Sequence, residues 1–140
     1  IGSCVVIVLY DKKNAVGAMT HSMLPTAYDD SETKREGRKI EDVQVHESKY
    51  INYTIPKMLD LVKKMGANKD DLMVKLVGGA TMFKSFSNHN KSVGERNVEF
   101  SKKTINDLGL VIDSEDTGGN HGRSVILNTA NGVLNVNSRI

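Results

Sequence analysis

Residues 5–10 form an uninterrupted apolar run rich in β-branched side chains, and this run constrains the fold more than any other part of the chain. A short run of this composition is typical of a buried β-strand. A polar turn of four residues, Asp11-Lys12-Lys13-Asn14, follows it. Residues 16–24 then have the composition of a returning strand, which Pro25 ends. The beginning of the chain therefore predicts a β-hairpin.

The predicted hairpin brings one cysteine and one histidine together. If Tyr10 and Ala15 pair across the four-residue turn, Cys4 lies directly opposite His21. Directly opposed residues on one face of a sheet have Cβ atoms about 5 Å apart, within reach of a thiol–imidazole contact. A shift of the pairing by one residue would place the two side chains on opposite faces.

A contact between cysteine and histidine is what thiol catalysis requires. The thiolate is the nucleophile, and an ordinary thiol with a pKa of about 8.5 is only slightly ionised at neutral pH. An imidazole can take the thiol proton and later deliver it to a leaving amine. Attack on a carboxamide would release ammonia and leave a thioester, which water would hydrolyse to a carboxylate. Structural roles stay open for both residues, because a lone cysteine in an apolar strand is usually an inert small hydrophobic residue and His21 could be a hydrogen-bonded core residue.

Beyond the hairpin, hydrophobic spacing predicts two helices and further strands. Residues 48–65 carry apolar side chains three and four positions apart, typical of one helix face, although Pro56 is awkward inside a helix. Ser92-Val93-Gly94-Glu95 has the form of a capping box and predicts the start of the second helix. Strands are expected at residues 72–77, 110–112, 124–127 and 133–136, the last two joined by a turn at Asn131-Gly132. The pattern predicts an α+β class with two main helices, in one domain spanning residues 1–140.

The segment of residues 26–47 differs from the rest of the chain. It is dense in Asp, Glu, Lys, Arg and Ser, with only isolated apolar residues. A long solvated loop is the expected structure. Because this segment follows the strand of His21 directly, it is also a candidate for a flap or a docking loop near the site.

Composition narrows the functional classes. The 140 residues carry 19 Lys and Arg against 17 Asp and Glu, a net charge of +2, and no basic stripe with interleaved aromatics, so nucleic-acid binding is not predicted. No apolar run is long enough to enter and cross a bilayer. Cys4 is the only cysteine, which excludes an internal disulfide and suits a reducing cytoplasm. His46, His89 and His121 lack the spacing of metal ligands, so no metal and no other cofactor is predicted.

Further polar groups are candidates for contacts with a substrate. Gly78 and Gly79 follow a predicted strand and could present N–H groups to an oxyanion, although a tight turn is the commoner role of such a pair. Ser3, next to the cysteine, is a third candidate. Arg96 and Asn97, at the start of the second predicted helix, are expected to hydrogen-bond another loop in the core.

A series of short motifs runs along nearly the whole chain, and their order and spacing are specific although each one alone is weak. They are Gly2-Ser3-Cys4-Val5, His21 followed by Met23-Leu24-Pro25, Lys49-Tyr50, Gly78-Gly79-Ala80 with Met82-Phe83, Gly94-Glu95-Arg96-Asn97, Asp116-Thr117-Gly118-Gly119-Asn120 and Gly122-Arg123. Together these motifs resemble the CheD family of chemoreceptor glutamine deamidases.

The resemblance has implications for fold and function. It implies a layered α/β/β sandwich of mixed, largely antiparallel sheets, similar to the deamidase domain of cytotoxic necrotizing factor toxins. It implies hydrolysis of Gln side chains in methyl-accepting chemotaxis receptors, with Cys4 as nucleophile and His21 as general base. It also implies a regulatory partner, a CheC-like phosphatase that such proteins bind and stimulate.

The sequence departs from the family pattern in two places. The third catalytic residue of the family is a Thr a few residues before the cysteine, and no residue of this sequence matches it; Thr20 and Ser22 are not substitutes. A preceding strand is expected upstream with that Thr. Residues 26–47 also look longer than the usual connection. Two other functions stay open: a binding module that regulates a CheC-like phosphatase with little catalysis of its own, and a thiol hydrolase with a different substrate.

Overall fold

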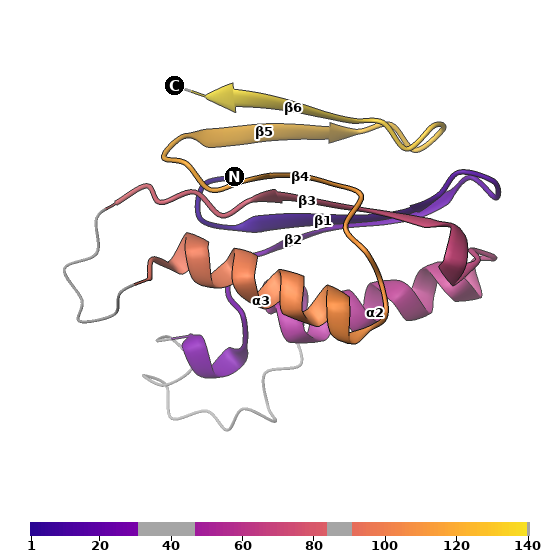
Figure 1. Cartoon of the computed structure of the whole chain (residues 1–140), viewed down its shortest axis with the longest axis horizontal. Helices are drawn as coiled ribbons and strands as arrows, with labels where there is room; N and C mark the ends of the chain where they lie inside the picture. The colour runs from indigo at the N-terminus through magenta and orange to yellow at the C-terminus, as the bar shows by residue number, and fades with distance from the viewer. Residues whose placement is uncertain (31–46, 84–90, 140) are drawn as a thin grey trace.

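The computed structural model describes residues 1–30, 47–83 and 91–139, and within these ranges it contains six strands and two main helices (Figure 1). The predicted flap or docking loop falls largely on residues 31–46, which lie outside the described residues. The elements are β1 (Val5–Asp11), β2 (Val16–Ser22), η1 (Ala27–Asp29), η3 (Glu47–Lys49), α2 (Ile51–Lys64), η4 (Lys69–Asp71), β3 (Leu72–Gly78), α3 (Val93–Asp107), β4 (Ser114–Thr117), β5 (Gly122–Leu127) and β6 (Leu134–Arg139).

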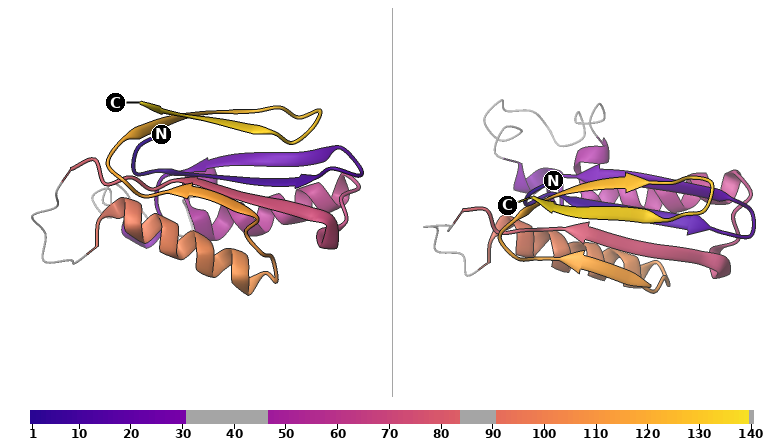
Figure 2. Two further views of the ribbon diagram at one scale, coloured as in Figure 1. Left: turned by 45° about the horizontal axis from the view of Figure 1, so that its top comes forward. Right: turned by 90° about the horizontal axis from the view of Figure 1, so that it is seen from above.

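Three layers make up the molecule. Four strands form one sheet in the order β2-β1-β3-β4, and β5 and β6 form a separate two-stranded ribbon. The helices α2 and α3 lie against one face of the four-stranded sheet, and the ribbon lies over the other face (Figure 1). Figure 2 shows the ribbon lying over the sheet, with its strands running nearly along those of the sheet, when the molecule is seen from above. Of the four strand pairs within the described residues, β3–β4 is parallel and the other three are antiparallel. The predicted α+β class and the layered α/β/β arrangement are confirmed.

The central strand β1 explains why this sequence builds three layers. All seven of its residues are buried, and alternate side chains of a strand point to opposite faces of the sheet. Val5, Ile7 and Leu9 belong to the core beneath the two helices. Val6, Val8 and Tyr10 belong to a smaller core beneath the ribbon. An apolar run without polar alternation therefore requires a cover on each face.

The two helices begin and end close to where their sequence signals predict. In α3 the Ser92 hydroxyl accepts a hydrogen bond from the Glu95 N–H, as the capping box requires, and Gly109 follows the helix with a φ of 76°. Helix α2 begins at Ile51 and accommodates Pro56 in its interior. Its fully buried residues Ile51, Ile55 and Val62 pack into the core beneath the helices.

The strand predicted at residues 110–112 is wrong. Leu110 is buried in the core beneath the helices, but no strand forms there. The fourth strand of the sheet is β4, a polar edge strand of sequence Ser-Glu-Asp-Thr. Its side chains are mostly exposed, so it carries no apolar signal, and its place is set by parallel pairing with β3. Among the described residues no helix is long and apolar enough to span a membrane.

Candidate active site

The pairing of β1 with β2 decides how Cys4 and His21 are related, and it differs from the predicted register. Val6, not Cys4, lies opposite His21. The turn comprises residues 12–15 instead of 11–14, because Asp11 remains in the strand opposite Val16. The Asp11 carboxylate accepts hydrogen bonds from the Asn14 N–H and side-chain amide and from the Asn68 N–H, at 3.2, 2.7 and 2.8 Å.

The correction moves the two residues apart along the strands but leaves them on one face. Cys4 precedes Val6 by two residues, so strand alternation gives it the same face as Val6 and as His21 opposite. Such diagonal neighbours lie about 7–8 Å apart, against about 5 Å for a directly opposed pair. Both residues therefore belong to the same end of the β1–β2 pair, on the face that the ribbon covers.

The glycine pair after β3 holds the backbone of Cys4. The Gly79 N–H donates to the Cys4 carbonyl at 2.8 Å, which continues the β1–β3 ladder by one step beyond Val5. A Cβ at Gly78 would overlap the Cys4 carbonyl oxygen, and Gly78 has a φ of 114°. With its donor committed to Cys4, Gly79 does not present a free N–H to an oxyanion, and positive φ at both residues fits a turn.

Helix α3 contacts both the segment that carries Cys4 and the segment that follows His21. The Asn97 side-chain amide donates to the carbonyls of Ser3 and Met23, each at 2.9 Å. Ser3 directly precedes Cys4, and Met23 lies two residues after His21. The expected hydrogen bonds from Asn97 to loops in the core are confirmed. Sequence motifs singled out this residue, but its partners lie 94 and 74 positions away, and no local pattern identifies them.

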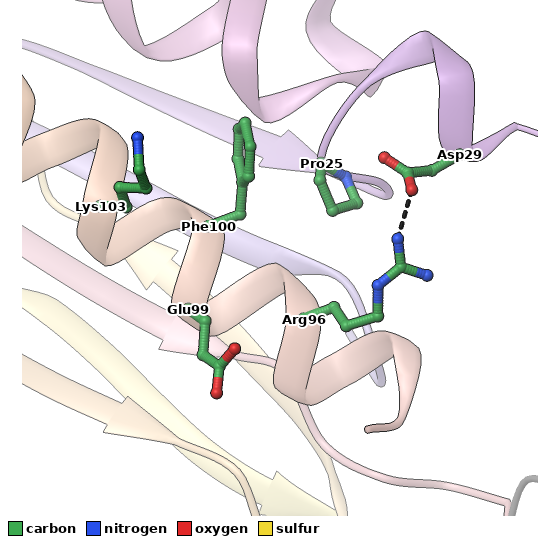
Figure 3. Close-up of a pocket in the computed structure, with 6 residues that line it drawn as sticks. All are labelled: Pro25, Asp29, Arg96, Glu99, Phe100 and Lys103. Atoms are coloured by element: carbon green, nitrogen blue, oxygen red, sulfur yellow. Dashed lines mark hydrogen bonds and ion pairs between the residues drawn. The ribbon is translucent and has the colours of Figure 1, made fainter. Parts of the chain in front are cut away.

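Arg96, next to Asn97, contacts the segment that follows β2 at a later residue, Asp29. Its guanidinium pairs with the Asp29 carboxylate, as Figure 3 shows. The two residues border a pocket of about 390 Å³ on the helix side of the sheet. This pocket contains neither Cys4 nor His21, so it is separate from the candidate active site. It is lined by Pro25, Asp29, Arg96, Glu99, Phe100 and Lys103 (Figure 3).

A second pocket, of about 470 Å³, is lined by His21. Val6 forms part of its floor, and Ser124 and Val125 of the ribbon form part of its wall. The neighbours of His21 point the other way: the Thr20 hydroxyl is 2.9 Å from the Thr54 hydroxyl, and Ser22 donates to the Ser48 carbonyl at 2.8 Å. Thr20 also borders the pocket, but its hydroxyl is paired with Thr54, so His21 is the base that the pocket presents.

The protonation states of the pair suit a base and an acid in their neutral forms. Burial raises the pKa of the Cys4 thiol above its usual value of 9.0, although the Cys4 backbone N–H opposes this. Partial burial lowers the pKa of His21 below its usual value of 6.5. At pH 7 the cysteine is therefore a thiol and the histidine a neutral imidazole that can accept a proton.

Comparison with known proteins places the chain in a family. The family model described as CheD chemotactic sensory transduction matches residues 23–138. The chain belongs to the CheD family. The resemblance inferred from the sequence motifs is thereby confirmed. Because the matched region begins after Cys4 and His21, it does not itself assign a role to either residue.

Curated relatives give the same result over more of the chain. A protein of Methanococcus maripaludis strain C5 is 43% identical over 136 residues, which covers 97% of this chain and 80% of the relative. Relatives from Methanosarcina barkeri and Pyrococcus abyssi are each 37% identical, over 134 and 132 residues; they cover 96% and 94% of this chain and 80% and 74% of their own length. All three are named probable chemoreceptor glutamine deamidase CheD.

Proposed function

We propose that this chain is a cysteine-dependent deamidase that converts Gln side chains of chemotaxis receptors to Glu. The observation that carries the proposal is the position of Cys4 and His21 on one face, at one end, of the β1–β2 pair, beside the pocket that His21 lines. The names of the curated relatives support the substrate class. Cys4 is the nucleophile and His21 the general base, and the reaction uses no cofactor.

The first half of the reaction forms a thioester. The neutral imidazole of His21 takes the Cys4 proton as the sulfur attacks the side-chain carbonyl carbon of the substrate Gln. The protonated imidazole then donates to the nitrogen, the carbon–nitrogen bond breaks, and ammonia leaves. Because the thiol pKa is raised and the imidazole pKa is lowered, the proton moves during the attack and not before it.

The second half releases the product. His21, neutral again, takes a proton from a water molecule that attacks the thioester carbon. The carbon–sulfur bond breaks, the proton returns to the sulfur, and the Glu carboxylic acid that forms releases its proton to the solvent, which leaves a carboxylate. Ser3, which adjoins Cys4, is the candidate group for the oxyanion of each tetrahedral intermediate, whereas Gly78 is paired with Thr117 in the β3–β4 ladder. Gly79 serves instead to hold the Cys4 carbonyl.

Mass spectrometry of receptor fragments tests the proposal. Fragments incubated with the wild-type protein should gain about one mass unit at a Gln as the amide becomes a carboxylate, and fragments incubated with Cys4→Ala should not. The Ser101→Ala variant is a matched control, because it also removes a single heavy atom from a side chain but lies on α3, away from the reacting groups.

Three results would contradict the proposal. Equal mass gain with Cys4→Ala would remove the cysteine from the mechanism. A Cys4→Ala protein that keeps its full effect on chemotaxis in cells would favour the alternative function, a binding module whose partner is a CheC-like phosphatase. Ammonia release from a free amide, without any receptor, would favour a small-molecule thiol hydrolase.

A further inference from the structure

The ladder between β1 and β2 ends just before it reaches Cys4. The last paired residues are Val5 and Ser22. Beyond them, the N–H groups of Met23 and Leu24 turn away and donate to the Lys49 carbonyl, at 2.9 and 3.2 Å. Regular strand pairing therefore fixes His21, which lies inside the ladder, but does not fix Cys4 relative to β2.

Asn97 bridges the two chains at the point where the ladder stops. One nitrogen, Nδ2, donates to both the Ser3 and the Met23 carbonyls at 2.9 Å. These carbonyls belong to the residue before the proposed nucleophile and to the second residue after the proposed base. The Asn97 amide thus links the two chains at the open end of the hairpin, as a ladder hydrogen bond links them inside it. Gly79 holds Cys4 from the β3 side.

Helix α3 is a firm support for this bridge. A Cβ at Gly94 would overlap the carbonyl oxygens of Gly79 and Ala80, so the first turn of the helix lies directly against the chain that holds Cys4. Ile105 anchors the same helix in the core beneath the helices. Asn97 itself is fully buried, and its position is therefore set by packing on every side.

The other half of the Asn97 amide makes no compensating contact. Among the described residues, Oδ1 of Asn97 is buried and has no hydrogen-bond partner. An unpaired buried acceptor is costly, so the favourable contribution of this side chain comes from the two hydrogen bonds that it donates.

We propose that Asn97 is a positioning residue, which acts by holding the Cys4 and His21 segments at the separation that proton transfer requires. This inference rests on the proposed function of the pair. Because Cys4 lies one residue beyond the β1–β2 ladder that fixes His21, their separation depends on the support at the open end of the hairpin. A misplacement of about 1 Å can cost about 10²-fold in rate.

The test is a double-mutant cycle on Asn97 and His21. Asn97→Ala should lower kcat for receptor deamidation by about 10²-fold with KM unchanged, because the substrate pocket keeps its lining. In a His21→Ala background the same substitution should have almost no further effect, because the base that it aligns is gone. Equal losses in the two backgrounds would overturn the proposal, and so would an unchanged kcat in the single variant.

Two more variants guard against a purely structural explanation. Asn97→Ser is a milder truncation that keeps a polar group but is too short to reach both carbonyls. It replaces Asn97→Ala in the test if that variant folds poorly, and it should show the same loss of kcat. Ser101→Ala, one turn farther along the buried face of α3, removes a hydroxyl that has no partner among the described residues. It should leave kcat unchanged; a loss equal to that of Asn97→Ala would contradict a specific role for Asn97.

Alkylation of Cys4 separates this inference from the proposed function. The rate of reaction with iodoacetamide at pH 7 needs no receptor, and it should fall in His21→Ala, in Asn97→Ala and no further in the double variant. If the wild type fails to deamidate receptors but the alkylation rates follow this pattern, the substrate is wrong and the positioning role stands. If deamidation occurs but the alkylation losses multiply, Asn97 does not act through His21.

Discussion

The two faces of the four-stranded sheet differ in how completely they are covered. Beneath α2 and α3, Val5, Ile7 and Leu9 join a large core of fully buried residues from both helices. Beneath the ribbon, Val6, Val8 and Tyr10 form a small core whose other members are only partly buried. A pocket borders each face, and His21 lines the one on the ribbon side. The larger core and the proposed base therefore lie on opposite faces of the same strands.

Strand β2 shows the division within three residues. Thr20 and Ser22 are directed to the helix side, where each makes a hydrogen bond to the region around α2. His21 between them is exposed on the ribbon side. Because a strand alternates its side chains, one residue can be changed for chemistry while its two neighbours are kept for packing. The predictions that follow test this separation.

Replacing His21 should affect catalysis far more than folding. His21→Ala removes the proposed base, and the loss of a general base typically lowers the rate by about 10²- to 10⁴-fold. Thr20→Val is the matched control on the other face: it removes the hydrogen bond to Thr54 and should lower the free energy of unfolding by about 1 kcal/mol while kcat stays unchanged. Deamidation kinetics and urea unfolding of both variants measure the two effects, and a larger kcat loss in Thr20→Val would break the separation.

A core residue beneath the helices should show the reverse behaviour. Leu76 is fully buried in β3 and packs into the core beneath the helices. Leu76→Ala should lower the free energy of unfolding by about 2–5 kcal/mol, through lost burial and the cavity that remains. The rate per folded molecule should stay near the wild-type value. A large kcat loss measured well below the unfolding midpoint would show that the helix face supports catalysis directly.

The pH dependence of the rate should follow the lowered pKa of His21. Its folded pKa lies below 6.5, so the imidazole is neutral at pH 7 and the rate is maintained until the pH falls through that lowered pKa. Below it, kcat/KM should fall about tenfold per pH unit as the base becomes protonated. The same shift disfavours the fold at low pH, since this contribution to stability is present above 6.5 and is lost as the pH falls toward and through the folded pKa.

The His21→Ala variant should reveal the ionisation of the Cys4 thiol in the pH dependence of the rate. Without a base, the nucleophile must ionise unaided, and burial raises the thiol pKa above 9.0. The residual rate should therefore climb about tenfold per pH unit through neutral pH. A rate that is flat between pH 7 and 9 in this variant would indicate that another group takes the proton.

Much of this architecture follows from local sequence patterns. The apolar run of β1, the helical spacing of α2 and the capping box of α3 each report on neighbouring residues, and each element formed where its pattern predicted. The hairpin register did not follow, because it depends on Asp11 accepting a hydrogen bond from Asn68, 57 residues away. Strand β4 did not follow either, since an exposed edge strand has no apolar alternation.

The candidate site was also predictable only in part from the sequence. Two reactive side chains on adjacent strands could be assigned to one face from parity alone, and a register error of two positions preserves parity. Their separation could not be predicted, because the support for Cys4 comes from Gly79 and Asn97, both distant in sequence. Long-range contacts of this kind leave no periodic signal in the chain.

The smallest predicted effect concerns the attachment of the ribbon. The Tyr10 hydroxyl donates to the Thr129 carbonyl, in the turn between β5 and β6, at 2.8 Å. Tyr10→Phe keeps the buried ring and removes this hydrogen bond, so the free energy of unfolding should fall by only about 0.5–1.5 kcal/mol. Amide hydrogen exchange should quicken in β5 and β6 and stay unchanged in α2, because the ribbon alone is released. Tyr53→Phe, at an exposed tyrosine of α2, is the matched control and should change neither region.

Since Ser124 and Val125 of the ribbon help to form the His21 pocket, KM for the receptor should rise in Tyr10→Phe while kcat is retained. Faster exchange in α2 as well would mean that the two faces of the sheet loosen together, and the separation of stability from chemistry would then fail.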